Sequence, residues 1–453
     1  MEIVSKVIRL FKDSIIIFSA QIGVLFLSLF ATVIVARNLG PEGKGIYSLV
    51  FLTVSSLFVF LNMGIGSSNT FMLGKKNASP NLIVNNSVFI TIILSTVPFS
   101  LIVFLPSRLL SAILPHISIS FIYLGLISLP LIFLIEYFNG ILLGLELYKK
   151  LSFGRICYSG CILLFLFIAF KIFSSGIEGA IVATILGTLA GVIFMVYVLI
   201  KAKVLTRRIK ITTGLMWDTL KFGSKLQVSN MIQFFNYRLD TFIVNYFLSP
   251  LHVGLYTAAV SFAELIWHIP NAISQNLFVA SSKSKTNKID EVTILIFRQT
   301  LFLVSIVAVL FLFLGRFLII ILLGNRFAGA YLPFKWLLIG VVALSTSKVI
   351  AADMVGRGYP GYCSMIATIS LVFTIVLDLL LIPRYGITGA AIASSISYTV
   401  SALLFILIFK RITKINLKKL FIPGQRDLKL YKAVFLKTVS IYKNLKGRNY
   451  EPI

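Results

Sequence analysis

The sequence contains one segment pattern twice, about 209 residues apart. The segment LGPEGKGIYSLV returns as LSPLHVGLYTAAV, which pairs Leu39 with Leu248, Pro41 with Pro250, Gly45 with Gly254 and Tyr47 with Tyr256. GIEGAIVAT at 176–184 returns about 210 residues later as GITGAAIAS at 386–394. This nearly constant register predicts two equivalent halves, each a multi-helix bundle. Two like halves in a bilayer are typical of transporters, which hold a cavity between them.

The composition is that of a polytopic membrane protein. Of the 453 residues, 58% are hydrophobic and only 13% are charged, which is too apolar for a soluble protein with one buried core. We predict twelve segments long enough to cross the hydrocarbon. They are 14–36, 45–66, 84–106, 117–141, 156–173, 179–200, 222–248, 253–279, 299–323, 332–352, 363–382 and 388–409. The expected fold is therefore an all-α membrane protein of two six-helix bundles, 1–211 and 212–409, followed by a tail, 410–453.

Basic residues lie mainly in alternate connections, and this asymmetry predicts the orientation because basic loops stay cytoplasmic. One set of connections, with the tail, holds most of the lysines and arginines. The other set holds only Arg37, Lys44, Arg108, Lys171, Arg316, Arg326 and Arg384. Both chain ends are therefore expected in the cytoplasm.

The formal net charge of +27 does not indicate nucleic-acid binding, because most of it is this topology signal plus the tail. Within the tail, Leu428, Tyr431, Phe435 and Val439 recur at helical spacing beside lysines. This pattern fits a helix lying on anionic membrane lipids, and a disordered topological anchor is the alternative.

No metal, cofactor or nucleotide site is indicated. The three cysteines, Cys157, Cys161 and Cys363, form neither a disulfide framework nor a metal-ligand spacing, and the chain has only three histidines. The nucleotide-binding pattern GxxxxGK[ST] does not occur in the sequence. Direct ATP hydrolysis is therefore not expected.

Segment 222–248 is unusually polar for a membrane helix. It contains Gln227, Ser229, Asn230, Gln233, Asn236, Tyr237, Arg238 and Asp240. A helix with these residues must line a wet cavity or neighbouring helices, because ionisable groups are costly in lipid. A shift of 209 residues places Arg238 on Leu29 and Asp240 on Ala31, so the repeated architecture does not require the charges. Arg238, Asn236, Tyr237 and Gln233 are candidate substrate-binding residues, and Asp240 is a candidate cavity or ion-coupling carboxylate. The alternative is that Arg238 or Asp240 only braces neighbouring helices.

Two further segments carry polar groups for the same cavity. Glu264 and His268 lie one turn apart, before a helix break expected at Pro270 and Asn271. Asn271, the repeat mate of Asn62, is a candidate substrate ligand, and Glu264 is a candidate proton or cation site or an ion-pair partner of Arg238. Lys348 either binds substrate or extends to the cytoplasmic edge.

Three strings carry a family resemblance: ARNLGPEGKGIYSLV, NYRLDTFIVNYFLSPLHVGLYTAAVSFAELIWHIPNAISQ and LLLIPRYGITGAAIASSISY. They resemble the polysaccharide biosynthesis flippases of the O-antigen type, in the superfamily that also holds multidrug extruders and lipid II flippases. The resemblance covers both halves, about 400 residues, and ends at the tail.

The resemblance implies a V-shaped transporter with alternating access and a cationic cavity. It further implies a cargo of undecaprenyl-pyrophosphate-linked oligosaccharide and a place in the bacterial cytoplasmic (inner) membrane, where glycan polymerase machinery is a possible partner. It carries roles over to Arg238, Asp240, Glu264 and Asn271.

Three other functions fit the sequence less well. A cation-coupled multidrug extruder has the same design but needs an acidic cavity for its cationic drugs. A membrane glycan polymerase or glycosyltransferase carries clustered catalytic groups and a large external loop, which the sequence lacks, so no enzyme is expected. A structural scaffold has no use for charges in segment 222–248.

The predicted orientation can be tested by labelling single cysteines with an impermeant reagent in a cysteine-free background. Cysteines near Pro41, Leu251 and Tyr385 should react from outside the cell, whereas those near Arg208 and Lys419 should not. Outside labelling near Arg208 would contradict the topology.

Overall fold

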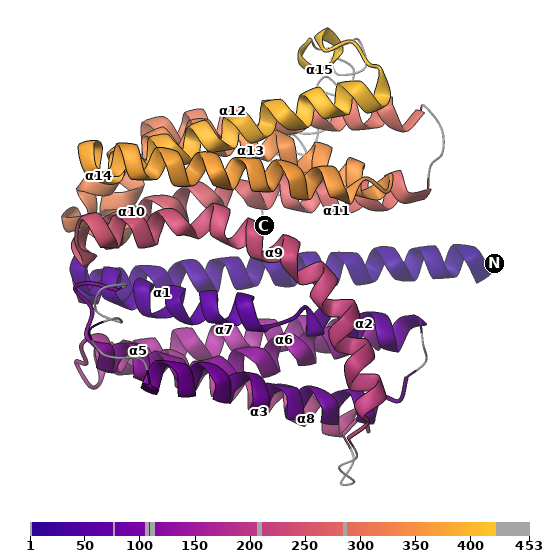
Figure 1. Cartoon of the computed structure of the whole chain (residues 1–453), viewed down its shortest axis with the longest axis horizontal. Helices are drawn as coiled ribbons and strands as arrows, with labels where there is room; N and C mark the ends of the chain where they lie inside the picture. The colour runs from indigo at the N-terminus through magenta and orange to yellow at the C-terminus, as the bar shows by residue number, and fades with distance from the viewer. Residues whose placement is uncertain are drawn as a thin grey trace, which may run out of the picture. The chain divides into compact units, whose positions relative to one another are not determined.

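The computed structural model describes residues 2–75, 78–104, 108, 114–205, 211–283 and 288–422, which form helices and no strands (Figure 1). The helices are α1 (Glu2–Leu61), α2 (Ile65–Lys75), α3 (Pro80–Phe104), α5 (Ile119–Leu126), α6 (Ser128–Gly144), α7 (Tyr148–Lys171), α8 (Ile177–Lys201), α9 (Thr213–Phe247), α10 (Pro250–Glu264), η1 (Leu265–Trp267), α11 (His268–Lys283), α12 (Lys288–Leu323), η2 (Asn325–Ala330), α13 (Tyr331–Gly356), α14 (Pro360–Thr413) and α15 (Lys418–Phe421). The predicted all-α class is confirmed.

The helices form two compact units, each assembled from separate parts of the chain. The first unit comprises Met1–Ser261, Leu314–Leu337 and Leu371–Ser394, and the second comprises Phe262–Phe313, Leu338–Ser370 and Ser395–Ile453. Each unit has its own apolar core, around Ile141 and Met195 in the first and around Val349 and Phe409 in the second. The boundary at 211/212, which rests on the repeat, is a different division and stays a prediction.

Eight of the described helical segments are long and apolar enough to span a membrane. Two of them, Ile16–Leu61 and Pro360–Thr413, are kinked at Gly40 and Gly386 and are each long enough to span twice. The eight therefore account for ten of the predicted spans. The other two, 222–248 and 253–279, correspond to α9 and to α10 with α11, whose polar residues keep them below the hydropathy of the rest.

The chain turns at equivalent points of the two repeats, but the turns differ in form. Gly40 has φ 69° and Gly386 has φ 60°, which an L-residue rarely adopts, so glycine allows a sharp kink in a continuous helix. The equivalent turns elsewhere separate α9 from α10 and α7 from α8. One repeat unit thus appears as a kinked helix in one half and as two helices in the other.

Within the first unit, α1 and α10 cross at repeat-related glycines. A Cβ on Gly45 would overlap the carbonyl oxygen of Pro250, and a Cβ on Gly254 would overlap that of Pro41. Next to this contact, the hydroxyl oxygens of Ser48 and Thr257, also 209 residues apart, lie 3.5 Å from each other. We call the contact between residues 41–48 and residues 250–257 the glycine crossing. Its reciprocal pattern shows that the two repeats meet there through equivalent residues.

Large apolar side chains stay exposed along the predicted spans. On α12, Phe313 is 76% exposed and Phe317 is 62% exposed. Such a surface is unfavourable in water and suits contact with lipid tails.

Only the beginning of the basic tail lies among the described residues. The short helix α15 docks on the second unit, where Leu420 is buried and Arg298 donates to the carbonyl oxygen of Ile422 at 2.7 Å. The predicted membrane-surface helix with Leu428, Tyr431, Phe435 and Val439 lies outside the described residues, as do several of the predicted cytoplasmic connections, including 206–210 and 284–287.

The glycine crossing predicts a selective sensitivity to a single methyl group. Gly45→Ala should destabilise the protein by about 1–3 kcal/mol, the usual cost of overpacking a tight contact. Gly160→Ala is the control, because a Cβ at Gly160 meets nothing within 4 Å. The measurement is the melting temperature of each detergent-purified variant. Equal melting temperatures for the two variants would contradict this prediction, because they would show that the glycine crossing accommodates the added methyl group without loss of stability.

Candidate functional site

Two pairs of polar residues connect α9 to α14 within the first unit. Asn236 and Asp240 lie one helical turn apart on α9, and Thr374 and Asp378 lie one turn apart on α14. Thr374 donates to the amide oxygen of Asn236 at 3.0 Å, and all four side chains are buried. Because the spacing is equal on both helices, Asp240 and Asp378 form the second pair. The two carboxyl groups lie within electrostatic range of each other.

Asp240 is held by hydroxyl and amide donors. The Tyr256 hydroxyl of α10 donates to its Oδ2 at 2.5 Å, and the Ser394 hydroxyl of α14 donates to the same oxygen at 3.2 Å. The backbone N–H of Thr241 donates to Oδ1 at 2.6 Å. Donors from three helices therefore fix this carboxylate in one orientation.

Asp378 is fully buried, and neither of its carboxyl oxygens receives a hydrogen bond from a described residue. It lies within electrostatic range of Asp240 and Tyr256. Like charges on two buried carboxyl groups repel each other, and the Arg238 guanidinium, which lies within electrostatic range of Asp240, offsets part of this repulsion. We call Asp240, Tyr256, Asp378 and Ser394 the carboxylate cluster. Its chemistry suits a proton or a small cation that prefers oxygen ligands.

The first half contains the same scaffold without the acids. Tyr47 and Thr184, the repeat mates of Tyr256 and Ser394, share a hydrogen bond of 2.8 Å. Ala31, the mate of Asp240, packs with Tyr47 in an apolar cluster around Val35 and Leu166. The carboxylates are therefore an addition to one copy of a repeated helix contact.

The other candidates on α9 lie in more accessible surroundings. Gln233 is exposed and donates to the Tyr237 hydroxyl at 2.7 Å, one turn further along. Arg238 is half-buried, and its guanidinium donates to the carbonyl oxygen of Tyr237 at 3.5 Å. Asn236, by contrast, is engaged with Thr374 in helix packing. The α9 candidates thus divide into buried residues and residues that a solute can reach.

The position of α9 is set by helices of the first half. Asn86 of α3 makes two hydrogen bonds of 3.1 Å with Thr212, the residue before α9. Gln227 donates to the carbonyl oxygen of Val59 on α1. One end of α9 is therefore fixed on α1 and α3, and the other end carries the carboxylate cluster.

A second group of candidates meets inside the second unit. The Lys348 ammonium on α13 donates to Asn271 Oδ1 at 3.0 Å and lies 4.3 Å from the centre of the Trp267 ring. Glu264 is within electrostatic range of Lys348, and His268 of both. We call Glu264, Trp267, Asn271 and Lys348 the lysine cluster. The structure thus brings together three residues selected from the sequence, Glu264, Asn271 and Lys348.

The helix break next to this cluster lies earlier than expected. The 3-10 turn Leu265–Trp267 separates α10 from α11, so Pro270 is the third residue of α11 and does not interrupt a helix. Proline suits the first turn of a helix, where its missing N–H has no partner to lose. Glu264 and Trp267 therefore stand at the break itself, and Asn271 follows one turn later.

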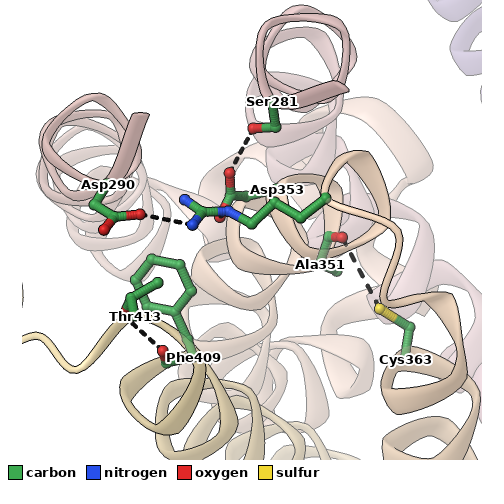
Figure 2. Close-up of polar contacts among 8 residues, drawn as sticks. Ser281, Asp290, Ala351, Asp353, Cys363, Phe409 and Thr413 are labelled. Carbon is green, nitrogen blue, oxygen red and sulfur yellow. Dashed lines mark hydrogen bonds and ion pairs between the residues drawn. The ribbon is translucent and has the colours of Figure 1, made fainter. Parts of the chain in front are cut away.

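The second unit also contains a compensated charge network (Figure 2). Arg357 lies 2.6 Å from Asp290 of α12 and 2.7 Å from Asp353 of α13, and Ser281 of α11 donates to Asp353. Asp353 is buried, and the Arg357 guanidinium also lies 5.8 Å from the Phe409 ring of α14. Arg357 lies in the turn between α13 and α14, and two aspartates hold its side chain against neighbouring helices. This network is a structural brace.

Three members of the carboxylate cluster were not selected as site residues from the sequence. Tyr256 and Ser394 belong to the repeated segments, and a repeat first indicates shared architecture. Asp378 was visible as an acid within an apolar run, yet only the packing of α14 on α9 shows its partner.

Solved transporter structures share the fold of this chain. A multidrug resistance transporter of the MATE family in the MOP superfamily, in an inward-facing conformation, aligns with a TM-score of 0.73 and 16% identity over 88% of this chain and 98% of that chain. The lipid II flippase MurJ, in an inward closed conformation, aligns with a TM-score of 0.72 and 17% identity over 94% of this chain and 99% of that chain. At such identities the likeness concerns the fold, and it confirms the predicted multi-helix transporter architecture.

A similar sequence comes from Shigella flexneri. It is a candidate O-antigen transporter, 24% identical over 402 residues, which are 84% of this chain and 93% of that protein. The family model described as polysaccharide biosynthesis protein matches residues 10–284, more than half of the chain. This match covers α1 to α9 and reaches beyond Asn271. The chain therefore belongs to the polysaccharide biosynthesis protein family.

Proposed function

We propose that this protein is a flippase that moves an oligosaccharide on undecaprenyl pyrophosphate from the cytoplasmic to the outer leaflet. Alternating access of the two halves performs the transfer, in support of cell-surface polysaccharide assembly. Family membership and the similarity to a candidate O-antigen transporter support this proposal. In the proposal both chain ends are cytoplasmic, the basic tail contacts anionic lipids, and polymerising enzymes use the delivered glycan.

The observation that carries the proposal is the accessible polar set on α9. Gln233 is exposed and bonded to Tyr237, and Arg238 is half-buried, all within a helix that corresponds to the predicted span 222–248. Lipid does not tolerate such groups, so this part of α9 lines water. Amide and hydroxyl groups suit sugar hydroxyls, and a guanidinium suits pyrophosphate.

The same set argues against a multidrug extruder with an acidic cavity. The carboxylates of α9 and α14 are buried and bonded or paired with each other, whereas the more accessible α9 candidates are neutral or cationic. An anionic cargo fits this distribution of charge, and a cationic drug does not.

The carboxylate cluster supplies the energy coupling in this proposal. A proton or a monovalent cation neutralises one of the two carboxylates, Asp240 or Asp378, and its release changes the packing of α9 against α10 and α14. The oxygens of Tyr256 and Ser394 complete the surroundings of the positive charge.

The function is tested by deleting the gene and restoring it with variants. The deletion strain should accumulate lipid-linked oligosaccharide and lose surface glycan, and the wild-type chain should reverse both effects. Arg238→Ala should reduce surface glycan at equal membrane abundance by about tenfold or more, because the cargo loses a charge-assisted contact. Arg238→Lys should keep part of the export through its charge. Normal export by a well-expressed Arg238→Ala variant would contradict a binding role and show that Arg238 only braces neighbouring helices.

The coupling role is tested by the thermal stability of the purified protein. If the cluster binds sodium, replacing choline with sodium should raise the melting temperature of the wild type and not of Asp378→Asn, since a ligand stabilises only the state that binds it. If it binds a proton, sodium should have no effect, and lowering the pH should stabilise the wild type more than the variant. Glu178→Gln, at an exposed acid on α8, is the matched control. Identical responses of wild type and Asp378→Asn to both ions would contradict the role.

A further inference from the structure

Lys44 is a buried cation in the glycine crossing. It is 4% exposed, and its ammonium donates to the Thr257 hydroxyl at 2.8 Å. No described residue forms an ion pair with it, and Glu42, two residues earlier on α1, is exposed. The sequence pattern counts Lys44 among the charges of an external connection, whereas the structure buries it between two helices.

The crossing does not need this lysine for packing. Val253, its repeat mate at the equivalent position of α10, is fully buried and apolar. Burying an ammonium against a single neutral hydroxyl is unfavourable relative to burying such an apolar side chain. A group retained at this cost without a counter-charge has a use in another conformation.

The predicted topology places the crossing at the outer end of the membrane helices. There Arg37 also links α1 to α12, by donating to the carbonyl oxygens of Leu322, at 2.8 Å, and Ile321. If the chain works by the alternating access proposed above, outward opening at this end requires α1 to separate from α10. That separation takes Thr257 away from Lys44 and leaves the ammonium facing water with no partner from α10.

We propose that Lys44 is a second anion-binding residue, concealed by Thr257 while the crossing is closed and available to the pyrophosphate of the cargo once it opens. This inference rests on the proposed flippase function. A lysine suits the task because its compact ammonium exchanges one oxygen partner for another without a fixed geometry. Thr257 only holds the Lys44 ammonium in the closed state and has no part in binding the anion.

Two substitutions distinguish the role of Thr257 in the closed state from the anion-binding role of Lys44. Both Thr257→Val and Lys44→Met remove the bond between the helices, so both should speed labelling of a cysteine at Ser48 by an impermeant maleimide. The background for this measurement replaces Cys157, Cys161 and Cys363. Thr257→Val should keep export, whereas Lys44→Met should lower surface glycan at equal membrane abundance by about tenfold, the loss of one charge-assisted contact. Lys44→Arg, which keeps the charge, should retain part of the export.

A direct measurement uses inorganic pyrophosphate as the probe. In the purified Thr257→Val variant, pyrophosphate should slow modification of Lys44 by an amine-reactive reagent, as followed by mass spectrometry of the peptide that contains it. The absence of protection, or equal export by Lys44→Met and Thr257→Val, would overturn the role of Lys44 alone. Absence of export by the wild-type chain would overturn the proposed function, and with it the cargo assigned to Lys44.

Discussion

The contact of two backbones at Gly45 and Gly254 sets much of the arrangement of the first unit. Helices in lipid associate by close packing, because lipid tails offer no hydrophobic force between them, and small residues allow that packing. Glycine at both positions brings each helix against the carbonyl oxygen of the other. This approach is what places Thr257 within hydrogen-bond distance of Ser48 and Lys44.

The repeat explains the scaffold of the carboxylate cluster but not its acids. Tyr47 bonds Thr184 in the first half as Tyr256 contacts Ser394 in the second, so one helix contact has been used twice. Only the second copy adds Asp240 and Asp378, and the first has Ala31 in an apolar cluster at the equivalent point. The repeated sequence thus accounts for the contact between tyrosine and hydroxyl residues in both halves, and the difference between the two copies accounts for the ionisable groups.

Hydropathy and periodicity predicted the helical class, the spans and the polar character of α9, because each is a local property of the chain. They also selected Asp240, Asn271 and Lys348, which are polar within apolar runs. They did not pair Asp378 with Asp240, because helices 138 residues apart must first pack in one register, as the Thr374–Asn236 bond shows. Charge counting treated Lys44 as a residue of a connection, because a count cannot show which charges are buried between helices.

Charge balance separates structural from functional groups in this molecule. Arg357 forms ion pairs with two aspartates, so its charge has partners within the protein and the network braces the helices of the second unit. Among the described residues, Lys44 has only a neutral hydroxyl, and Asp378 has only the like charge of Asp240. Lys44 therefore lacks a charge of opposite sign that an anionic ligand can supply. The aspartates are partly compensated, because the Arg238 guanidinium lies within electrostatic range of Asp240. A buried lysine without a counter-charge has no use in a static membrane scaffold, whereas in the proposed flippase it supplies a site for the anionic part of the cargo.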